Sequence, residues 1–289
     1  MANETTTSLA TELILTEVVN REVIRAAYAE VVAAPLVRVK DIADQPTLTA
    51  TFPKYPKLTA SALTEGTDMS NTAVNTTGVS IDAGEVGLMV TITDLLKAAA
   101  VNPITEDLAQ EMGRAIAEKI DTDITAEFAN FSLTAGTSGA DMTLSDLIDA
   151  VYALENANAP GPYVAILHPI QIADLRKDIV SNAATAFSLV PDSMKQALLA
   201  GGELSLEIMG VQIFRSTTCA SVNTNADRQG GMFPARDLVA PIGMALKQVS
   251  RTEFQRDASL RATEVVVTSV YGVGTINAAW GVKIVTDHE

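Results

Sequence analysis

Residues 102–130 read NPITEDLAQEMGRAIAEKIDTDITAEFAN and contain the clearest local signal in the chain. Asn102 can cap a helix that begins at Pro103, and Glu106 and Asp107 place negative charge in its first turn, where the helix dipole favours it. Apolar residues then recur at every fourth position: Ile104, Leu108, Met112, Ile116, Ile120, Ile124 and Phe128. The spacing predicts one helix over 103–130, on the order of 40 Å long at about 1.5 Å per residue.

The apolar stripe of this helix rotates along its length. Four residues turn a helix by about 400°, so the stripe advances by roughly 40° at each step. A long helix with a rotating stripe contacts different neighbours along its course, which favours a spine that lies across a sheet. For this segment taken alone, an ordinary long helix in a bundle is the alternative.

The chain before the helix divides into an arm and a hairpin. Residues 8–34 carry apolar positions at helical spacing, and Pro35 is expected to end this helix because the residue before a proline is pushed out of the helical region. From 36 to 92, short alternating apolar runs broken by Pro and Gly predict strands. The middle of this stretch, 59–77, is too small and polar to form a core. We therefore expect an extended hairpin over 47–92 that leans on another surface.

The chain after the helix predicts a second unit. The small polar run 135–141 is expected to be a flexible connector. Thr143 and Asp146 form a capping-box-like pair ahead of an amphipathic helix, with Asp in place of the usual Glu. Residues 163–167 are a continuous apolar strand, and Pro169 can open the next helix.

The remaining predicted elements follow in chain order: a short helix over 191–200, a two-strand unit over 204–213, a mobile polar loop over 222–231 and a strand over 238–247. Two late strands, 264–271 and 276–285, are expected to flank a hairpin turn at Gly272-Val273-Gly274. Helices and strands in this arrangement predict an α+β fold.

Composition limits the class of protein. Of the 289 residues, 47% are hydrophobic and 19% are charged, which is typical of a globular protein. The net charge of -15 argues against a protein that grips nucleic acid through its phosphates, because the two would repel. The N-terminus does not read as a signal peptide, and no run approaches roughly 18 uninterrupted apolar residues. We expect a soluble protein of the cell interior that makes no membrane contact.

Residues with catalytic chemistry are few. His168 follows a predicted strand, where it is expected to satisfy local backbone, and His288 lies near the C-terminus. The single cysteine, Cys219, excludes an intrachain disulfide and has no neighbouring histidine, so we interpret it as a buried or incidental thiol.

Residues with metal-binding or cofactor-binding patterns are equally scarce. Asp121, Asp123 and Glu127 could bind a hard cation, but they fit a solvated helix face better. Gly272-Val273-Gly274 is a fragment of a dinucleotide fingerprint, yet strand-like residues follow it instead of a helix. We therefore predict that the chain is no enzyme, has no catalytic, cofactor-binding or metal-binding residue, and uses no cofactor.

Two stretches carry a resemblance to a known family. Residues 163–177, YVAILHPIQIADLRK, look like the strand and helix at the heart of the axial A-domain in major capsid proteins of tailed bacteriophages of the Hong Kong 97 type. Residues 261–283, RATEVVVTSVYGVGTINAAWGVK, resemble the closing strands of the peripheral P-domain in that family. Neither stretch is a catalytic motif, and the order of elements across nearly the whole chain carries more of the resemblance than either.

The resemblance implies a Hong Kong 97-like fold in five segments: an N-terminal arm (1–46), an extended E-loop hairpin (47–92), a P-domain part (93–142) with the spine helix (103–130), an A-domain (143–245) and P-domain return strands (246–289). It implies a structural subunit of an icosahedral phage head, assembled in the host cytoplasm into hexamers and pentamers that enclose double-stranded DNA in the virion. The implied partners are other copies of the chain, a separate scaffolding protein, a portal and decoration proteins, with packaged DNA nearby only non-specifically.

The chain departs from the prototype of that family in one respect. A long helical scaffolding segment precedes the capsid domain of the prototype, whereas only the short arm precedes the first strand here. We therefore expect that any scaffold is a separate protein, or that the short arm itself serves. Lys54 and Lys57 lie in the hairpin, where one branch of the family forms cross-links, but no partner is identifiable and we predict none. Two alternatives stay open: an encapsulin shell protein of the same fold, and an α+β ligand-binding protein or enzyme.

Overall fold

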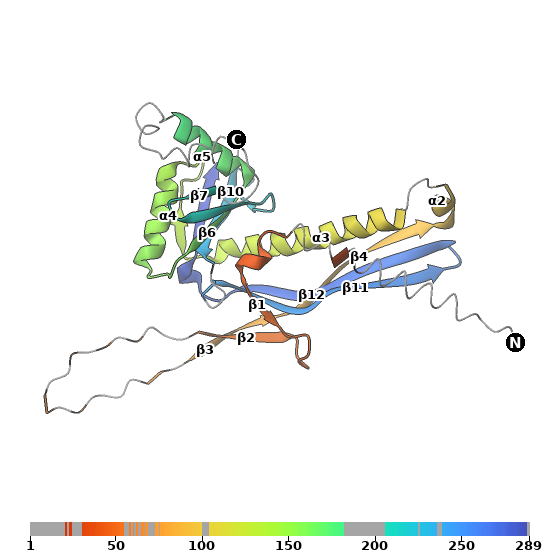
Figure 1. The fold of residues 1–289 in the computed structure, drawn as a ribbon, viewed down its shortest axis with the longest axis horizontal. Helices are drawn as coiled ribbons and strands as arrows, with labels where there is room; N and C mark the ends of the chain where they lie inside the picture. Colours follow the sequence, from red (N-terminus) through yellow and green to blue (C-terminus); the bar gives the residue numbers. More distant parts are fainter. Residues whose placement is uncertain are drawn as a thin grey trace.

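The protein is an elongated molecule of mixed helices and strands (Figure 1). The computed structural model describes residues 21, 23, 24, 31–54, 76–99, 104–181, 206–224, 226–235 and 239–287, together with scattered positions between 58 and 74. The strands form a four-stranded sheet in the order β1-β11-β12-β4, a seven-stranded sheet in the order β5-β13-β10-β6-β8-β7 with β9 beside β10, and a two-stranded sheet of β2 and β3. The expected mixture of helices and strands is therefore present.

The long helix expected over 103–130 is present as α3 (Ile104–Ala126), followed directly by a 3-10 turn, η2 (Glu127–Asn130). Its stripe side chains Met112, Ile116, Ile124 and Phe128 are buried. The helix lies along the four-stranded sheet in Figure 1, and its stripe shares a core with β12 side chains. The spine interpretation is thus confirmed over the bundle alternative. The proposed cap, Asn102, and Pro103 lie outside the described residues.

The four-stranded sheet is built on two long antiparallel strands, β11 (Ile242–Asp257) and β12 (Ala262–Thr275). β4 (Gly84–Thr93) pairs antiparallel with β12, and β1 (Arg38–Asp41) pairs parallel with β11. A short helix, α2 (Asp94–Ala99), follows β4 at the far end of the sheet, which is the end opposite the hairpin of β2 and β3 in Figure 1. Arg256 binds the carboxylate of Asp94 there through two contacts of 2.6 Å, which joins the ends of β11 and β4.

The predicted hairpin turn at Gly272-Val273-Gly274 is wrong. β12 continues through these residues and pairs with β11, with Gly272 opposite Ala245 and Gly274 opposite Gly243. A Cβ at Gly272 would lie 2.1 Å from the carbonyl oxygen of Asp82, so this glycine permits a close crossing of two strands instead of a turn.

The segment 246–289, expected to hold the P-domain return strands, contributes to two sheets. The last strand, β13 (Val282–Asp287), pairs antiparallel with β10 and parallel with β5 (Leu133–Ala135), so it belongs to the seven-stranded sheet. A boundary at 245 would also fall inside β11. The apolar alternation of β13 predicts a strand but does not say which sheet receives it.

The seven-stranded sheet carries α4 (Leu144–Asn156) and α5 (Pro169–Ser181) against one face. The capping box is confirmed: the amide of Asp146 donates to Thr143 Oγ1 (3.3 Å) and the amide of Thr143 donates to Asp146 Oδ2 (2.9 Å). The expected strand 163–167 is present as β6 (Tyr163–Leu167).

The predicted two-strand unit is also confirmed, as β7 (Leu206–Ile208) and β8 (Val211–Arg215). Met209 and Gly210 between them both have positive φ, the geometry of a tight hairpin turn. The short helix expected over 191–200 lies outside the described residues.

The mobile polar loop predicted over 222–231 is wrong. Its second half lies in β10 (Asp227–Pro234), an interior strand between β13 and β6, and its first residue belongs to β9 (Ser221–Val222). A Cβ at Gly230 would lie 2.6 Å from Leu167 Cδ2, and one at Gly231 would lie 2.6 Å from the Phe128 ring. The glycines therefore mark close packing on both faces of a buried strand, and not a flexible turn.

The connector expected over 135–141 is tied to the same strand. Asp227 is fully buried and accepts hydrogen bonds from Ser138 Oγ (2.5 Å), the amide of Gly139 (2.9 Å) and the side chain of Asn223. The amide of Asp287 on β13 donates to the carbonyl of Ala140 (2.9 Å). The segment that the sequence predicts as a free connector is therefore fixed by hydrogen bonds to β10 and β13.

The hairpin strands are β2 (Thr49–Lys54) and β3 (Thr77–Asp82), which pair antiparallel and project from the lower side of the molecule in Figure 1. The pairing ends at Asp82, earlier than the expected limit of 92, because the chain then enters β4 and the four-stranded sheet. The base of the hairpin has its own small core around Phe52, and Arg38 and Lys40 lie over that ring, 5.4 and 5.9 Å from its centre. Residues 59–77 are mostly outside the described part.

The role predicted for Pro35 is wrong. Pro35 lies inside a 3-10 turn, η1 (Ala34–Leu36). Proline is tolerated there because the amide groups in the first turn of a helix have no partner within the helix. Residues 1–20 and 25–30 of the arm lie outside the described part.

Candidate assembly surface

The histidine and cysteine positions have structural surroundings. His168 Nδ1 accepts a hydrogen bond from the amide of Ile170 (3.3 Å), as expected for a side chain at a strand end. Cys219 is buried, and this burial raises the pKa of its thiol to about 12, so the thiolate needed by a nucleophile is disfavoured at neutral pH. His288 lies outside the described residues.

The three carboxylates of α3 and η2 contact two different segments, the arm near Val32 and strand β12. Asp121 accepts hydrogen bonds from the amides of Val32 (2.9 Å) and Ala33 (3.0 Å) and is 3% exposed, so the expectation that it lies on a solvated face is wrong. Burial raises the pKa of Asp121, and the two amide hydrogen bonds partly oppose that rise.

Asp123 accepts from the hydroxyl of Tyr271 (2.8 Å), and Glu127 accepts from Thr275 Oγ1 (2.8 Å). These carboxylates fasten the spine helix to β12 and do not converge on a common point. Within the described ranges, no group of three or more His, Cys, Asp or Glu residues could hold a metal ion. No helix in that part of the chain is long and apolar enough to cross a membrane.

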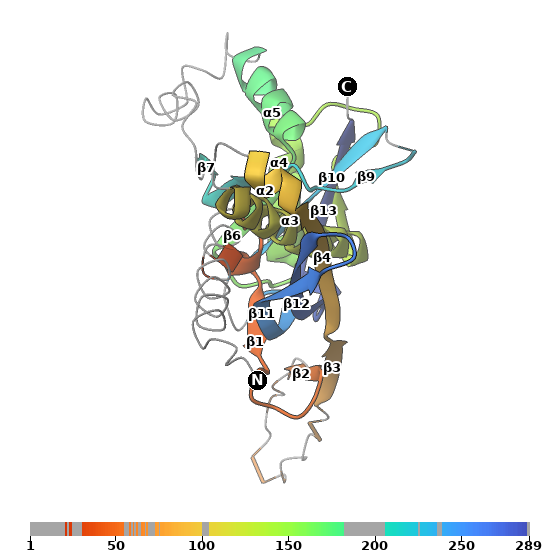
Figure 2. The ribbon, with the colours of Figure 1, turned by 90° about the vertical axis from the view of Figure 1, so that its right-hand side faces the viewer.

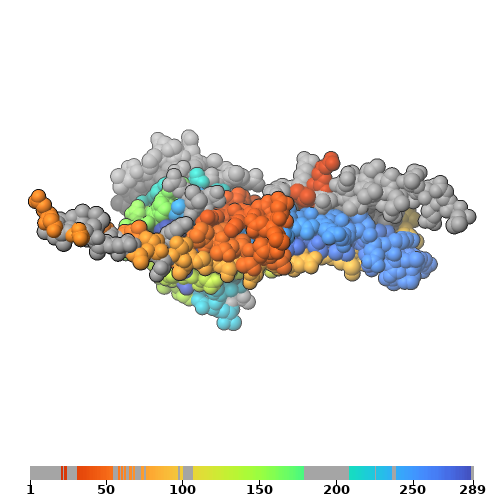
Figure 3. Space-filling model, turned by 90° about the horizontal axis from the view of Figure 1, so that it is seen from below, coloured from red at the N-terminus to blue at the C-terminus, as the bar shows by residue number. Residues whose placement is uncertain are grey.

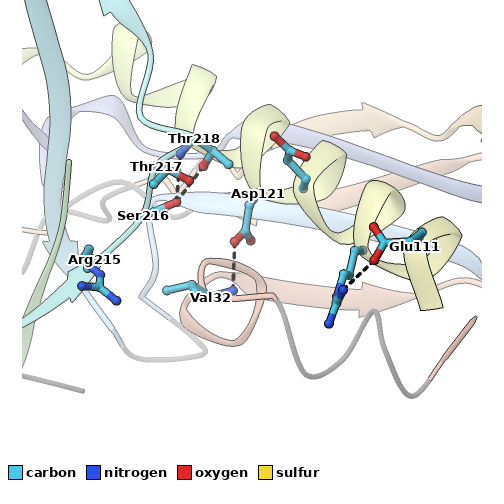
Figure 4. A pocket seen from close by; sticks show the side chains of 9 residues that line it. Val32, Glu111, Asp121, Arg215, Ser216, Thr217 and Thr218 are labelled. Carbon is cyan, nitrogen blue, oxygen red and sulfur yellow. Dashed lines mark hydrogen bonds and ion pairs between the residues drawn. The ribbon is translucent and has the colours of Figure 1, made fainter. Parts of the chain in front are cut away.

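An open pocket of about 530 Å³ lies between α3, Val32 and the loop after β8 (Figure 4). Several of its polar lining residues are paired: Arg114 binds Glu111 (2.6 Å), Asp121 accepts from the amide of Val32, and Ser216 bonds Thr218 (2.8 Å). No nucleophile and base lie together among its lining residues, which gives it no arrangement typical of catalysis.

Apart from Val39 and Met209, the large apolar side chains exposed in the described part of the chain lie in three places. They are the hairpin (Leu48, Leu58 and Val74), strand β4 and the adjoining end of the four-stranded sheet (Met89, Leu95, Leu96 and Leu260) and the outer face of α4 (Ile148 and Tyr152). Leu95 is 81% exposed and Tyr152 is 65% exposed. Apolar side chains gathered on a surface mark sites of protein association.

These places lie far apart on the molecule. Figure 3 shows the orange segment that contains β2 over the middle of the lower face, with blue residues of β11 and β12 beyond it. In Figure 1, α2 lies at one end of the elongated body and α4 at the other. A subunit exposing apolar side chains at both ends and on a projecting hairpin can contact several neighbours at once.

Sequence reasoning missed two of these three places. Ile148 belongs to the apolar set of α4, but Leu147, Ala150 and Leu154 form the buried face, so Ile148 and Tyr152 lie outside it. The spacing of four between Ile148 and Tyr152 was the available signal. At the far end, helix α2 is too short to show a period, and nothing in the sequence separates its exposed leucines from core residues.

Comparison with known proteins shows the family of the chain. The chain matches the model of a family described as phage capsid protein over residues 76–284, which is most of its length. A search of curated proteins finds no match. The structure is similar to that of Mycobacterium phage Che8 (TM-score 0.68, 17% identity, 88% of this chain and 90% of that one).

Two further solved structures share the fold. One is the capsid of Helicobacter pylori bacteriophage KHP30 (TM-score 0.68, 13% identity, 90% of this chain and 91% of that one), and the other is a virus-like particle from Pyrococcus furiosus (TM-score 0.60, 12% identity, 93% and 98%). Proteins of the matched family are structural, which excludes the alternative of a ligand-binding protein or enzyme. The chain belongs to the phage capsid protein family and is a structural subunit of a bacteriophage capsid.

Proposed function

We propose that the chain is a major capsid subunit of the Hong Kong 97 type, which forms hexamers and pentamers of an icosahedral head around double-stranded DNA. The observation that carries this proposal is the geometry of the body: a long sheet crossed by one spine helix, with a hairpin that projects beyond it (Figure 1). A closed shell needs each subunit to contact several copies, and the three exposed apolar places supply separate contact surfaces.

The proposed division of the chain follows the observed strands. The arm is 1–46 and the E-loop hairpin begins at 47. The P-domain contains β4, α3, β11 and β12, and the A-domain contains the seven-stranded sheet with α4 and α5. β13 is assigned to the A-domain, because it pairs with β10.

Assembly would depend on many modest contacts. When several weak interfaces engage together, the later ones form at high effective concentration, so the closed shell is stable although each pair of subunits binds weakly. The net charge of -15 would keep packaged DNA from adhering to the shell wall. Assembly in the host cytoplasm would involve a separate scaffolding protein, and the finished head would add a portal and decoration proteins.

The test is imaging of the purified chain with and without its scaffolding protein. Electron microscopy and sedimentation are expected to show shells, capsomers or tubes. A species that stays monomeric at high concentration in both preparations would contradict the proposal.

An encapsulin-type compartment is the second candidate, supported by the fold shared with the Pyrococcus furiosus particle. The contents of recovered particles separate the two functions. Small uniform shells that hold an enzyme support the compartment, and larger particles filled with DNA support the phage head.

A further inference from the structure

Lys247 is the extra residue of a β-bulge in β11. Its neighbours Leu246 and Gln248 lie opposite Tyr271 and Val270, which are consecutive residues of β12, so Lys247 has no residue opposite it. The bulge lies just beyond the point where the pairing of β11 with β1 ends. A bulge changes the direction of the side chain of its extra residue, and bulges are common beside functional sites.

The ammonium group of Lys247 lies against the turn 42–45, which follows β1. Lys247 Nζ donates hydrogen bonds to the carbonyl oxygens of Ile42 (3.1 Å), Ala43 (3.1 Å) and Gln45. These three bonds use every N–H group that an ammonium has. All three acceptors are main-chain carbonyls, and carbonyl oxygens directed at one point are the ligands with which proteins replace the hydration shell of a monovalent cation.

The turn joins the body of the molecule to the hairpin. Its first amide, from Ile42, donates to the carbonyl of Leu246 on β11 (2.9 Å), and the amide of Gln45 donates to the carbonyl of Ile42 (3.1 Å). The Ile42 side chain is 1% exposed and belongs to the core at the base of the hairpin, together with Phe52. In Figure 2 the orange chain leaves the lower end of β1 and reaches β2 below the four-stranded sheet. The turn is therefore bound to β11 on one side and to the hairpin on the other.

The other strand of the hairpin has a much shorter connection to the body. β3 ends at Asp82 and β4 begins at Gly84, and the amide of Ala83 between them donates to the carbonyl of Leu48 (2.8 Å). Gly272 of β12 permits a close contact with the Asp82 carbonyl there. The connection from β1 to β2 is longer than this single residue, so its geometry depends more strongly on the contacts that hold the turn.

We propose that the carbonyls of the turn 42–45 form a monovalent-cation site that the chain fills with its own ammonium group, and that Lys247 thereby fixes the angle between the hairpin and the four-stranded sheet. Without the ammonium, three carbonyl oxygens are directed at one point with no cation between them. The hairpin then keeps its attachment through Ala83 and loses the rigid one through the turn. Lys247 is a positioning residue in this sense.

The angle can be measured in the free subunit. Lys247→Met keeps most of the side-chain stem and removes the ammonium. Spin labels on Lys54→Cys and Gln255→Cys report the distance between the hairpin and β11, and we expect a narrow distribution with Lys247 and a broader or displaced one with methionine. Lys119→Met is the control, because it removes the same charge from an exposed ion pair with Asp123. A distribution that Lys247→Met leaves unchanged would overturn the inference.

Chemical rescue tests the cation site itself. In Lys247→Ala, the amides of Ile42 and Gln45 are expected to exchange at least about tenfold faster than in wild type. Ammonium chloride is expected to slow them again by at least about threefold, whereas tetramethylammonium chloride at the same concentration has no N–H to donate and should not. Loss of packing by the lysine stem would not respond to either salt, so equal exchange in the two salts would refute the cation site. If Lys247→Ala does not fold, Lys247→Met is measured in both salts.

The consequence for assembly rests on the proposed function. A subunit whose hairpin adopts many angles presents it to neighbouring copies less often in the correct place, so folded Lys247→Met is expected to give at least about fivefold fewer regular shells than wild type, and Lys119→Met should give as many. A normal yield of regular shells from Lys247→Met with a broadened distance distribution would show that the angle does not limit assembly. A wild-type chain that forms no shells would instead count against the proposed function.

Discussion

β10 and β4 are strands of similar length that lie in different sheets and have opposite surroundings. β10 begins Asp-Arg-Gln-Gly-Gly and lies in the middle of the seven-stranded sheet, where the buried Asp227 accepts hydrogen bonds from Ser138, Gly139 and Asn223. β4 contains Val-Gly-Leu-Met-Val-Thr-Ile, forms the edge of the other sheet and exposes every second residue. The comparison teaches that a polar side chain can be buried in a sheet when its hydrogen bonds are satisfied. It also teaches that apolar side chains can be exposed on a strand where the surface binds a partner.

The largest effect on stability is expected from a substitution that disrupts the packing of β10 against Phe128. Gly231→Leu places a side chain into the Phe128 ring, 2.6 Å from the new Cβ, so we expect a loss of about 3 kcal/mol or more in the free energy of unfolding. Urea denaturation followed by circular dichroism measures it.

The control lies at the start of β4. Gly84→Ala adds a Cβ with nothing within 4 Å, so its free energy of unfolding should stay within about 0.5 kcal/mol of wild type. Equal losses in the two glycine variants would contradict the contrast between the strands.

The second largest effect is expected from removing the buried carboxylate of Asp227, which hydrogen-bonds β10 to the segment around Ser138. Hydrogen bonds from Ser138, Asn223 and the Gly139 amide lower the pKa of Asp227 below its ordinary value of 3.8. A lowered folded-state pKa stabilises the fold at neutral pH, and this contribution is lost as pH falls from about 3.8 through the folded-state value. Asp227→Asn should therefore lower the melting temperature at pH 7. The difference in melting temperature between this variant and wild type should become smaller as the pH falls.

Melting curves from pH 7 to about pH 2 measure this gap, because the contribution is lost below about pH 3.8. Asp257→Asn is the matched control. The pKa of Asp257 is also lowered, mainly by the hydrogen bond from Ser259, but Asp257 lies at the turn between β11 and β12, outside the core. A gap for Asp227→Asn that stays constant with pH would show that the carboxylate charge does not stabilise the strand.

Local signals predicted much of this fold. The period of four in α3, the capping box of Thr143 and Asp146, and the apolar run of β6 each depend on neighbours within one element, and all three are observed. The fate of β13 and of Gly272 depends on strands far away in the chain, namely β10 and β3, so no local pattern could reveal them.

The polar composition of residues 222–231 led to the wrong prediction of a mobile loop, because hydrogen bonds from distant residues bury part of this segment. The partners of Asp227 include Ser138, 89 residues away in the chain, so its burial is invisible in the sequence around β10. The absence of a catalytic set was predicted from residue counts alone. The candidate assembly surface was predictable only at the hairpin, because an exposed leucine on α2 and a buried one on α3 look alike before the fold is known.

The smallest effect on folding is expected at the edge of β4. Met89→Lys replaces an exposed side chain, so the free energy of unfolding of the subunit should change by less than about 0.5 kcal/mol. A lysine on an edge strand opposes pairing with another strand, so the same variant should assemble poorly. Gln212→Lys, exposed on β8 of the other sheet, adds the same charge and should assemble like wild type. Sedimentation of both variants beside urea denaturation separates folding from assembly, and equal particle yields from the two would remove β4 from the contact surface.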